Sequence, residues 1–464
     1  MLSPLHQSAL QSPTAIALIA KGRGTSYRSL SQQVLALGEQ LLEQGMQPGD
    51  RLACIASNCA EMLKLYWVCV DHGWVFCPLS PKFPDSQLSA LLQRFAIHYL
   101  WCPDDTREQL WQQRHRLQPD FTLAKSYNVP EISIDMPVNI ILTSGSSGVP
   151  KAALHSLRGH IANAEGSLRL ITLQVSDGWL ASLPMFHIGG LAIINRCALA
   201  AATVIIPDND LTLAQQLKRD PISHLSLVAT QLQQLLDEAP TSLVLIKYLL
   251  LGGGAISQSL LDRMQSMDMQ VLTSYGMTEM GSQITTGPAR SDGSSGKLLP
   301  KRELTIRDGV IWVKGETLFL GYLQDDGTVD KATDADGWFC SKDLGYWDAT
   351  GLLHIQGRAD NMFICGGENI QPEEVETALK LHSDIIEAVV FPMTDAKFGS
   401  LPAAVVKTRS GQLPDAEEIK RFLSQHIAAF KRPRQYYLWP VDEQQGLKVQ
   451  RRQIIAKVTT TPAQ

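Results

Sequence analysis

The stretch LVLIKYLLLGGGAISQSLLDRM, residues 243–264, decides the fold class of this 464-residue chain. A run of leucine and β-branched residues leads into three glycines, and these lead into a segment whose apolar residues recur at helical spacing. This order is typical of a buried strand, a tight turn and an amphipathic helix. HLSLVATQLQQLLDEA, residues 224–239, likewise passes from an apolar run into an amphipathic helix, and DRLACIAS, residues 50–57, reads as another buried strand. We therefore expect a layered α/β body with largely parallel strands.

A helix is predicted just before the strand at 50–57. Apolar residues from Leu30 to Leu42 recur at helical spacing. Ser29, with Gln32 three residues after it, is the expected N-cap, and Gly45 stands where the helix should end.

The character of the sequence changes after about residue 296. Short strand-like runs separated by turn residues, such as ELTIRDGVIWVKG at 303–315, predict an antiparallel β portion. From Asp360 the pattern becomes that of a small α+β domain, with helices predicted at 372–382 and 416–430 and strands between them. We predict a large multi-layer α/β domain with a β portion over 1–359, and a small, mobile α+β domain over 360–464.

Composition narrows the classes of function. Lys and Arg total 41 against 46 Asp and Glu, for a net charge of −5, with no long run of like charge. This disfavours nucleic acid or a membrane surface as the main partner. The eight cysteines show no C-x-x-C pair, and no apolar run is long enough to cross a bilayer, so we expect a cytoplasmic protein with reduced thiols and no membrane insertion. The sequence leaves open whether the protein forms a homo-oligomer.

The segment LTSGSSGVPKAALHS, residues 142–156, is rich in glycine and hydroxyl residues. Its backbone N–H and side-chain O–H groups can converge on an anion, of which phosphate is the first candidate. It does not fit the G-x-x-x-x-G-K-[ST] phosphate loop or the G-x-S-x-G nucleophile turn. A flexible surface turn is an equally good reading of this stretch alone.

Four later segments stand in order behind this loop. They are SYGMTEMGS (274–282), GWFCSKDLGYWD (337–348), GRADNMFICGGENIQPEEVE (357–376) and GLKVQRRQI (446–454). Together the five resemble the adenylate-forming superfamily of acyl-CoA synthetases, firefly luciferase and peptide-synthetase adenylation domains. The resemblance runs from about Thr25 to Lys448, and it implies that Mg-ATP and a carboxylic acid form an acyl-AMP, from which a thiol displaces AMP.

The resemblance also implies roles for individual residues. The mobile loop over the departing phosphates corresponds to Thr143, Ser144, Gly145, Ser146, Ser147, Gly148 and Lys151. The adenine would lie against Gly253, Gly254, Tyr275 and Gly276, and the ribose against Asp343 and Arg358. Thr278 would hold the α-phosphate, Glu279 the magnesium ion, and Lys448 would be the catalytic cation that helps two anions meet.

Each of these residues also has a plainer reading. The glycines from Gly252 to Gly254 are compatible with a strand-to-helix turn, Tyr275 with a core aromatic, and Thr278 with a helix cap. Asp343 and Arg358 are compatible with surface ion-pair residues. The sequence departs from the family at Ser147, where threonine is common, and at Lys342, which precedes the expected ribose carboxylate and has no assigned role.

The identity of the acid is inferred from a narrower resemblance. SLPMFHIGG (182–190), followed by Arg196, is similar to the o-succinylbenzoate–CoA ligases of bacterial menaquinone biosynthesis. That resemblance implies a dianionic acid, with His187 beside the acyl group and Arg196 facing the retained carboxylate. A core histidine and a helix-surface arginine are the alternatives.

Gly366 and Gly367 match the family segment that approaches coenzyme A, and Asp360 matches the hinge about which the small domain rotates. A CoA ligase for another aryl or medium-chain acid is the alternative within this fold, and a luciferase-like monooxygenase is a more distant one. The alternative from another class is a non-catalytic nucleotide-binding relative. Lys448, Glu279 and Arg358 together argue against it.

Overall fold

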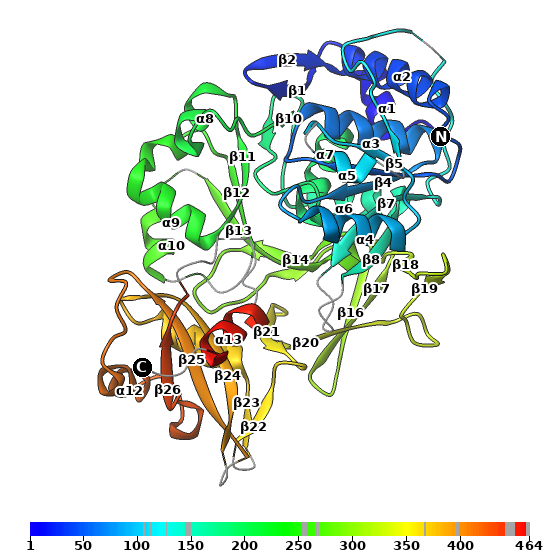
Figure 1. Cartoon of the computed structure of the whole chain (residues 1–464). Helices are drawn as coiled ribbons and strands as arrows, with labels where there is room; N and C mark the ends of the chain where they lie inside the picture. The colour runs from blue at the N-terminus through cyan, green and yellow to red at the C-terminus, as the bar shows by residue number, and fades with distance from the viewer. Residues whose placement is uncertain are drawn as a thin grey trace.

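The computed structural model describes residues 1–104, 107–111, 114–126, 128–143, 150–252, 256, 258–265, 267, 269–365, 368–395, 399–440 and 451–460. Figure 1 shows a large N-terminal part, coloured blue through green to yellow, and a smaller C-terminal part, coloured mostly orange to red. This is the predicted fold class, a large α/β domain followed by a small α+β domain.

One mixed sheet of the large domain is built around the strand predicted at 50–57. In spatial order its strands are β19 (Val329–Asp330), β18 (Gly321–Leu323), β8 (Lys151–Ser156), β7 (Pro137–Thr143), β4 (Val75–Leu79), β3 (Arg51–Ile55), β5 (Tyr99–Trp101) and β6 (His115–Arg116). β3 runs parallel to β4 and β5, as predicted, whereas β7 and β8 form an antiparallel hairpin.

A second mixed sheet contains the strand of the stretch at residues 243–264. Its strands, in spatial order, are β15 (Lys297–Leu298), β14 (Ser282–Pro288), β13 (Gln270–Met277), β12 (Tyr248–Gly252), β11 (His224–Val228), β9 (Gly178–Leu180), β10 (Thr203–Ile205), β1 (Ile16–Ala20) and β2 (Arg23–Ser26). β11, β12 and β13 are parallel, and β14 folds back antiparallel to β13.

Helices fill the space between the two sheets and cover their outer faces. The inner helices are α1 (Pro4–Gln11), α2 (Tyr27–Glu43), α3 (Ala60–His72), α6 (Leu157–Leu168) and α7 (Ile188–Ala200), and the outer ones are α4 (Asp85–Arg94), α5 (Glu108–Trp111), α8 (Leu213–Arg219), α9 (Ala229–Glu238) and α10 (Gln258–Gln265), with η1 (Pro240–Leu243) after α9. After Arg51, β3 is apolar because Leu52 and Cys54 enter the central core while Ala53 and Ile55 enter the core beneath α4.

The start of α2 differs from the prediction. Ser26, not Ser29, is the N-cap, and its Oγ accepts a hydrogen bond from the Ser29 N–H at 3.2 Å. The helix begins at Tyr27 because this buried side chain anchors it, donating to the carbonyl oxygens of Cys197 and Ala202. The predicted end is confirmed, since Gly45 follows the helix at a φ of +97°.

The β portion predicted after residue 296 is an antiparallel sheet. Its strands, in spatial order, are β16 (Arg302–Arg307), β17 (Val310–Gly315), β20 (Phe339–Trp347) and β21 (Leu353–Arg358). Asp343 lies inside β20 and faces Arg358 of β21. Lys342 beside it has a φ of +61°, so the strand is locally irregular next to Asp343.

The small domain packs helices on both faces of a sheet. That sheet consists of β24 (Ile385–Asp395), β25 (Gly399–Thr408) and β26 (Gln435–Leu438), and β22 (Phe363–Cys365) and β23 (Glu368–Ile370) form a separate two-stranded sheet. The helices are α11 (Pro372–Lys380), α12 (Ala416–Leu423), η3 (Ala429–Lys431) and α13 (Arg451–Thr460). Val390 and Val406 pack beneath α11 and α12, and Val389 and Val405 pack with Ile454 of α13 on the other face.

The helix predicted at 416–430 ends early, at Leu423, and η3 forms separately. Ser424 Oγ donates to the Arg421 carbonyl at 2.6 Å, a local bond that competes with continuing the helix. The eight cysteines are unpaired thiols, as expected. Across the described ranges, no helix combines the length and the apolar character needed to cross a membrane.

Candidate active site

The β13–β14 hairpin carries the segment SYGMTEMGS at the junction of the two domains (Figure 1). η2 (Thr278–Met280) connects the two strands, and Gly276 lies opposite Gln283 across the ladder. A Cβ added to Gly276 would lie 2.0 Å from the Ser282 carbonyl oxygen, so only glycine fits this close turn. The hairpin therefore places Tyr275, Thr278 and Glu279 within five consecutive residues at one edge of the sheet.

Tyr275, Asp343 and Arg358 meet in one hydrogen-bonded group. The Tyr275 hydroxyl donates to Asp343 Oδ2 at 2.6 Å, and Arg358 Nη1 donates to Asp343 Oδ1 at 3.0 Å. Burial and the neighbouring Asp343 carboxylate raise the pKa of Tyr275 well above its ordinary value, so the hydroxyl keeps its proton. Asp343 and Arg358 are an ion pair, but the Asp343 side chain is only 12 % exposed, so the surface reading is wrong for it.

Arg358 also binds Asp360, where the small domain is predicted to begin. Its Nε and Nη2 donate to the two carboxylate oxygens of Asp360 at 2.9 and 3.2 Å. This bond holds the pKa of Asp360 below its ordinary value, and the charge of Lys342 acts in the same direction. One guanidinium thus joins the predicted ribose carboxylate to the predicted hinge residue, and Lys342 contributes to the charge balance there.

Glu279 is held by a residue that the sequence reasoning missed. The hydroxyl of Tyr322, on β18, donates to Glu279 Oε1 at 2.7 Å. Lys151 lies over the same tyrosine, its Nζ 4.5 Å from the ring centroid. Tyr322 follows Glu279 by 43 residues and belongs to the other large sheet, so no local spacing signalled the contact.

Thr278 is fixed through its backbone. His155 Nε2 donates to the Thr278 carbonyl oxygen at 2.8 Å, and Asn139 lies between His155 and His160. Burial lowers the pKa of His155 to about 4, so its ring is neutral near pH 7. Asn139 and His155 lie on β7 and β8, so the hairpin that presents Thr143 and Lys151 is tied directly to the Thr278 turn. The sequence reasoning assigned no role to these three side chains.

His187 and Arg196 lie at opposite parts of α7. His187 is the exposed residue at the N-cap, with its ring 4.9 Å from that of Phe186, so the core-histidine alternative is wrong. Arg196 is 1 % exposed and donates from Nη2 to Gln283 Oε1 at 2.7 Å, so the helix-surface alternative is wrong as well. Burial lowers the pKa of Arg196 to about 10, which leaves it charged near pH 7.

Several predicted site residues lie outside the described part of the chain. They are Ser144, Gly145, Ser146, Ser147, Gly148, Gly253, Gly254, Gly366, Gly367 and Lys448. Their described neighbours are in place: Thr143 pairs with Lys151, and Gly252 pairs with Ser274 next to Tyr275. Within the described residues, no group of three or more His, Cys, Asp and Glu side chains has the arrangement of a metal site.

Comparison with known proteins agrees with this arrangement. The AMP-binding enzyme family matches residues 5–323, and the AMP-binding enzyme C-terminal domain matches residues 374–444. The 2-succinylbenzoate–CoA ligase of Haemophilus influenzae is 33% identical over 418 residues, covering 89% of this chain and 88% of that enzyme.

Two solved structures of o-succinylbenzoate CoA synthetase (MenE) from Bacillus subtilis are similar over nearly the whole chain. The complex with ATP and magnesium ion has a TM-score of 0.86 at 28% identity, covering 98% of this chain and 99% of that one. The complex with the acyl-adenylate intermediate OSB-AMP has a TM-score of 0.86 at 28% identity, covering 98% of each chain. The family match, the shared fold and the clustered motif residues lead to one conclusion: this chain belongs to the AMP-binding enzyme family.

Proposed function

We propose that this chain is an ATP-dependent acid–CoA ligase that converts 2-succinylbenzoate, ATP and CoA to 2-succinylbenzoyl-CoA, AMP and pyrophosphate, a step of menaquinone biosynthesis. The observation that carries the proposal is the Tyr275–Asp343–Arg358 group, whose tyrosine lies on the same hairpin as Glu279. Relatives over most of the chain are named 2-succinylbenzoate–CoA ligase, which supports the choice of acid.

ATP would bind to side chains that form hydrogen bonds with one another in this structure. The ring of Tyr275 would pack on adenine, beside Gly276 and the glycines Gly253 and Gly254. Asp343 would accept hydrogen bonds from the ribose hydroxyls, with Arg358 donating to the same sugar. Thr278, fixed by His155, would present its hydroxyl to the α-phosphate. The loop from Thr143 to Lys151 would stabilise the charge on departing pyrophosphate.

Glu279 has the chemistry needed to hold magnesium on ATP. Its Oε1 accepts from Tyr322, while in the described ranges no donor reaches Oε2. One carboxylate oxygen, completed by phosphate oxygens and water, is a common shell for this ion. When bound, magnesium would neutralise charge on the phosphates.

The reaction would proceed in two steps at one site. A carboxylate oxygen of the acid attacks the α-phosphorus, a new O–P bond forms, and the bond to pyrophosphate breaks. The CoA thiolate then attacks the acyl carbon, a C–S bond forms, and AMP leaves with the carboxylate-derived oxygen. Lys448 would supply the cation for the first step, in which two anions approach each other.

The acid would lie near α7. His187, exposed at the start of the helix, would stand beside the reacting acyl group, and the buried charge of Arg196 would face the retained carboxylate. Burying that carboxylate without a cation would cost several kcal/mol, so the pairing favours a dianionic acid.

The second step would require a different placement of the small domain. We propose the boundary at residues 359 and 360, with Asp360 as the hinge and Gly366 and Gly367 facing CoA. We also propose that the protein is located in the cytoplasm. That it forms a homo-oligomer stays a prediction.

The test is an assay of AMP formation by the purified protein with Mg-ATP and CoA. The acids are 2-succinylbenzoate, benzoate, 4-coumarate and hexanoate. We expect 2-succinylbenzoate to exceed the others in kcat/KM by at least roughly a hundredfold, the scale of a few kcal/mol of transition-state discrimination. A maximum at another acid would overturn the substrate assignment, and absence of acid-dependent AMP formation would overturn the ligase assignment.

A further inference from the structure

Arg196 and Arg302 are two buried arginines whose described partners include no carboxylate. Arg196 is 1 % and Arg302 5 % exposed. Arg302 donates to the carbonyl oxygens of Gln283, Pro300 and Asn163, at 2.6, 2.7 and 3.2 Å. Arg196 has the Gln283 side chain and the ring of Trp179, whose centroid is 5.2 Å from the guanidinium carbon. Two positive charges are therefore buried against neutral groups, an arrangement that is costly without an anion.

One hydrogen-bond donor of Arg196 is unpaired among the described residues. This donor is Nε, which is buried. Buried N–H groups are nearly always paired, and an unpaired one on a charged side chain indicates a partner that is not part of the chain. That partner has to be an acceptor, and an anion would also compensate the charge.

Gln283 is oriented by its own contacts. Its Nε2 donates to Thr286 Oγ1 at 2.7 Å, and the Thr286 hydroxyl uses its proton on the Thr285 carbonyl at 2.7 Å. The Thr286 oxygen must therefore accept, which fixes the amide with Nε2 toward Thr286 and Oε1 toward Arg196. Arg302 fixes the backbone of the same residue.

This arrangement lies at the candidate active site. Gln283 pairs across the β13–β14 ladder with Gly276, the residue after Tyr275. It follows Glu279 by four positions, beyond the η2 turn. The Arg196 guanidinium, which binds Gln283, is thus brought to the hairpin that carries the nucleotide and metal residues.

We propose that Gln283 is a specificity-determining residue, because it gives Arg196 an uncharged acceptor and so leaves the arginine's charge to be compensated by the retained carboxylate of a dianionic acid. The inference rests on the proposed function, since it concerns the same acid. A glutamate of nearly the same shape at this position would compensate Arg196 permanently. The neutral amide costs the empty protein stability and makes the site selective for a second negative charge.

The test compares the variants Gln283→Glu and Gln283→Met with the wild type. Substrates are 2-succinylbenzoate and two analogues, each lacking one of its carboxylates, of which the one that is turned over serves as the monoanionic reference. We expect Q283E to lower the ratio of kcat/KM for the dianion over the monoanion by at least roughly tenfold. Q283M removes the acceptor without adding charge, so it should keep the ratio within about threefold of the wild type even where both rates fall together.

Thermal unfolding without substrates gives a second readout. Q283E should melt above the wild type because it pairs a buried cation, and Q283M should melt below it. Equal ratios in Q283E and Q283M, or a Q283E protein that is no more stable than the wild type, would overturn the inference. If the wild type activates no dianionic acid, the proposed function fails, and the order of melting temperatures still decides whether Gln283 leaves Arg196 uncompensated.

Discussion

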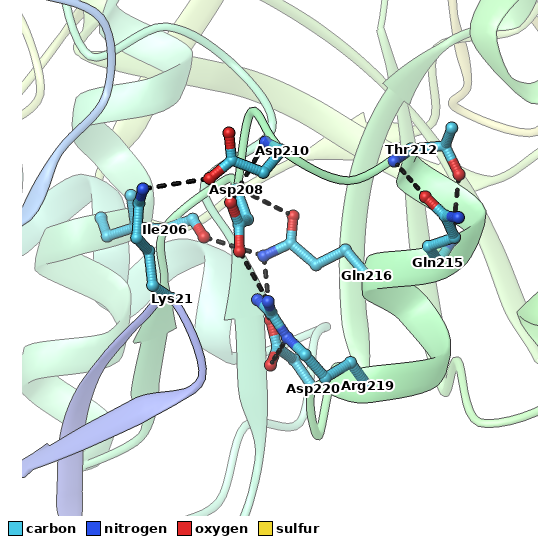
Figure 2. Close-up of polar contacts among 9 residues, drawn as sticks. All are labelled: Lys21, Ile206, Asp208, Asp210, Thr212, Gln215, Gln216, Arg219 and Asp220. Atoms are coloured by element: carbon cyan, nitrogen blue, oxygen red, sulfur yellow. Dashed lines mark hydrogen bonds and ion pairs between the residues drawn. The ribbon is translucent and has the colours of Figure 1, made fainter.

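Two arginines of this protein have nearly the same hydrogen bonds and serve different ends. Arg219 forms a two-bond contact with Asp220 and a single bond to Asp208 at 2.6 Å (Figure 2). Arg358 forms a two-bond contact with Asp360 and a single bond to Asp343 at 3.0 Å. Ion-pair geometry alone therefore does not separate a structural cluster from a candidate site.

The two clusters differ in what they connect. The first cluster falls within 13 consecutive residues and consists of Asp208, Gln216, Arg219 and Asp220. The Gln216 amide donates to the Asp220 carboxylate and to the Ile206 carbonyl oxygen, so the cluster fixes α8 to the end of β10 (Figure 2). The Arg358 group gathers Tyr275, Asp343 and Asp360 from three separate segments at the domain junction. A cluster assembled from distant segments, with an aromatic ring among its members, is the better candidate for ligand binding.

The largest effect is expected from Arg358→Met. Removing this side chain leaves the Asp343 carboxylate without its cation where the ribose is proposed to bind. We expect kcat/KM for ATP to fall by roughly a hundredfold or more, the scale for leaving a mostly buried carboxylate without its cation in a binding site. Steady-state kinetics and thermal unfolding should show lost activity with little change in melting temperature. A loss of stability that accounts for the lost activity would make this cluster structural, like that of Arg219.

The next largest effect is expected from an acid titration, which should distinguish His155 at the candidate site from Asp208 in the Arg219 cluster. The pKa of His155 is lowered to about 4 by burial, from an ordinary value near 6.5, so the unfolded state binds the extra proton between these values. Stability should therefore fall as the pH drops from about 6.5 to 4, by up to about 3 kcal/mol. The pKa of Asp208 is lowered by its bond to Arg219, so its contribution is lost only below the ordinary carboxylate range.

Urea unfolding of the wild type and His155→Gln at pH 7, 6, 5 and 4 measures this effect. The variant should show a shallower decline above pH 4, although His160, whose pKa burial also lowers, contributes in the same direction. Identical slopes for the two proteins would contradict the assignment of a neutral, buried His155.

The smallest effect on catalysis is expected from Arg219→Met. The carboxylates of Asp208 and Asp220, only 4 % and 3 % exposed, would lose their cation, so the melting temperature should fall by a few degrees. The folded protein should keep wild-type kcat/KM for ATP, since this cluster joins α8 to the end of β10 and includes none of the candidate-site residues. A selective loss of ATP turnover would remove the distinction between the two arginines.

The sequence allowed much of the site to be predicted because its motifs keep neighbouring functions together. Tyr275 and Glu279 are on one turn, and Asp343 and Arg358 are brought together by adjacent antiparallel strands. The parallel α/β body followed from apolar runs, since strands buried on both faces need no alternation.

What could not be predicted depends on contacts between distant segments. The bonds from Tyr322 to Glu279, His155 to Thr278 and Arg196 to Gln283 span 43, 123 and 87 residues. Nothing in their local spacing distinguishes these side chains from ordinary core or surface residues. The N-cap of α2 was misplaced for a similar reason, because the contacts of Tyr27 with residues near α7 decide where the helix begins.

The central claim is that a carboxylate oxygen of the acid attacks the α-phosphorus of ATP. The most direct measurement uses 2-succinylbenzoate labelled with ¹⁸O in its carboxylates, together with Mg-ATP, CoA and the wild-type protein, and mass spectrometry of the products. We expect AMP to carry one ¹⁸O atom for each thioester formed, because AMP leaves with the oxygen that attacked it. Unlabelled AMP, or ¹⁸O appearing in inorganic phosphate alongside ADP, would contradict an acyl-adenylate route.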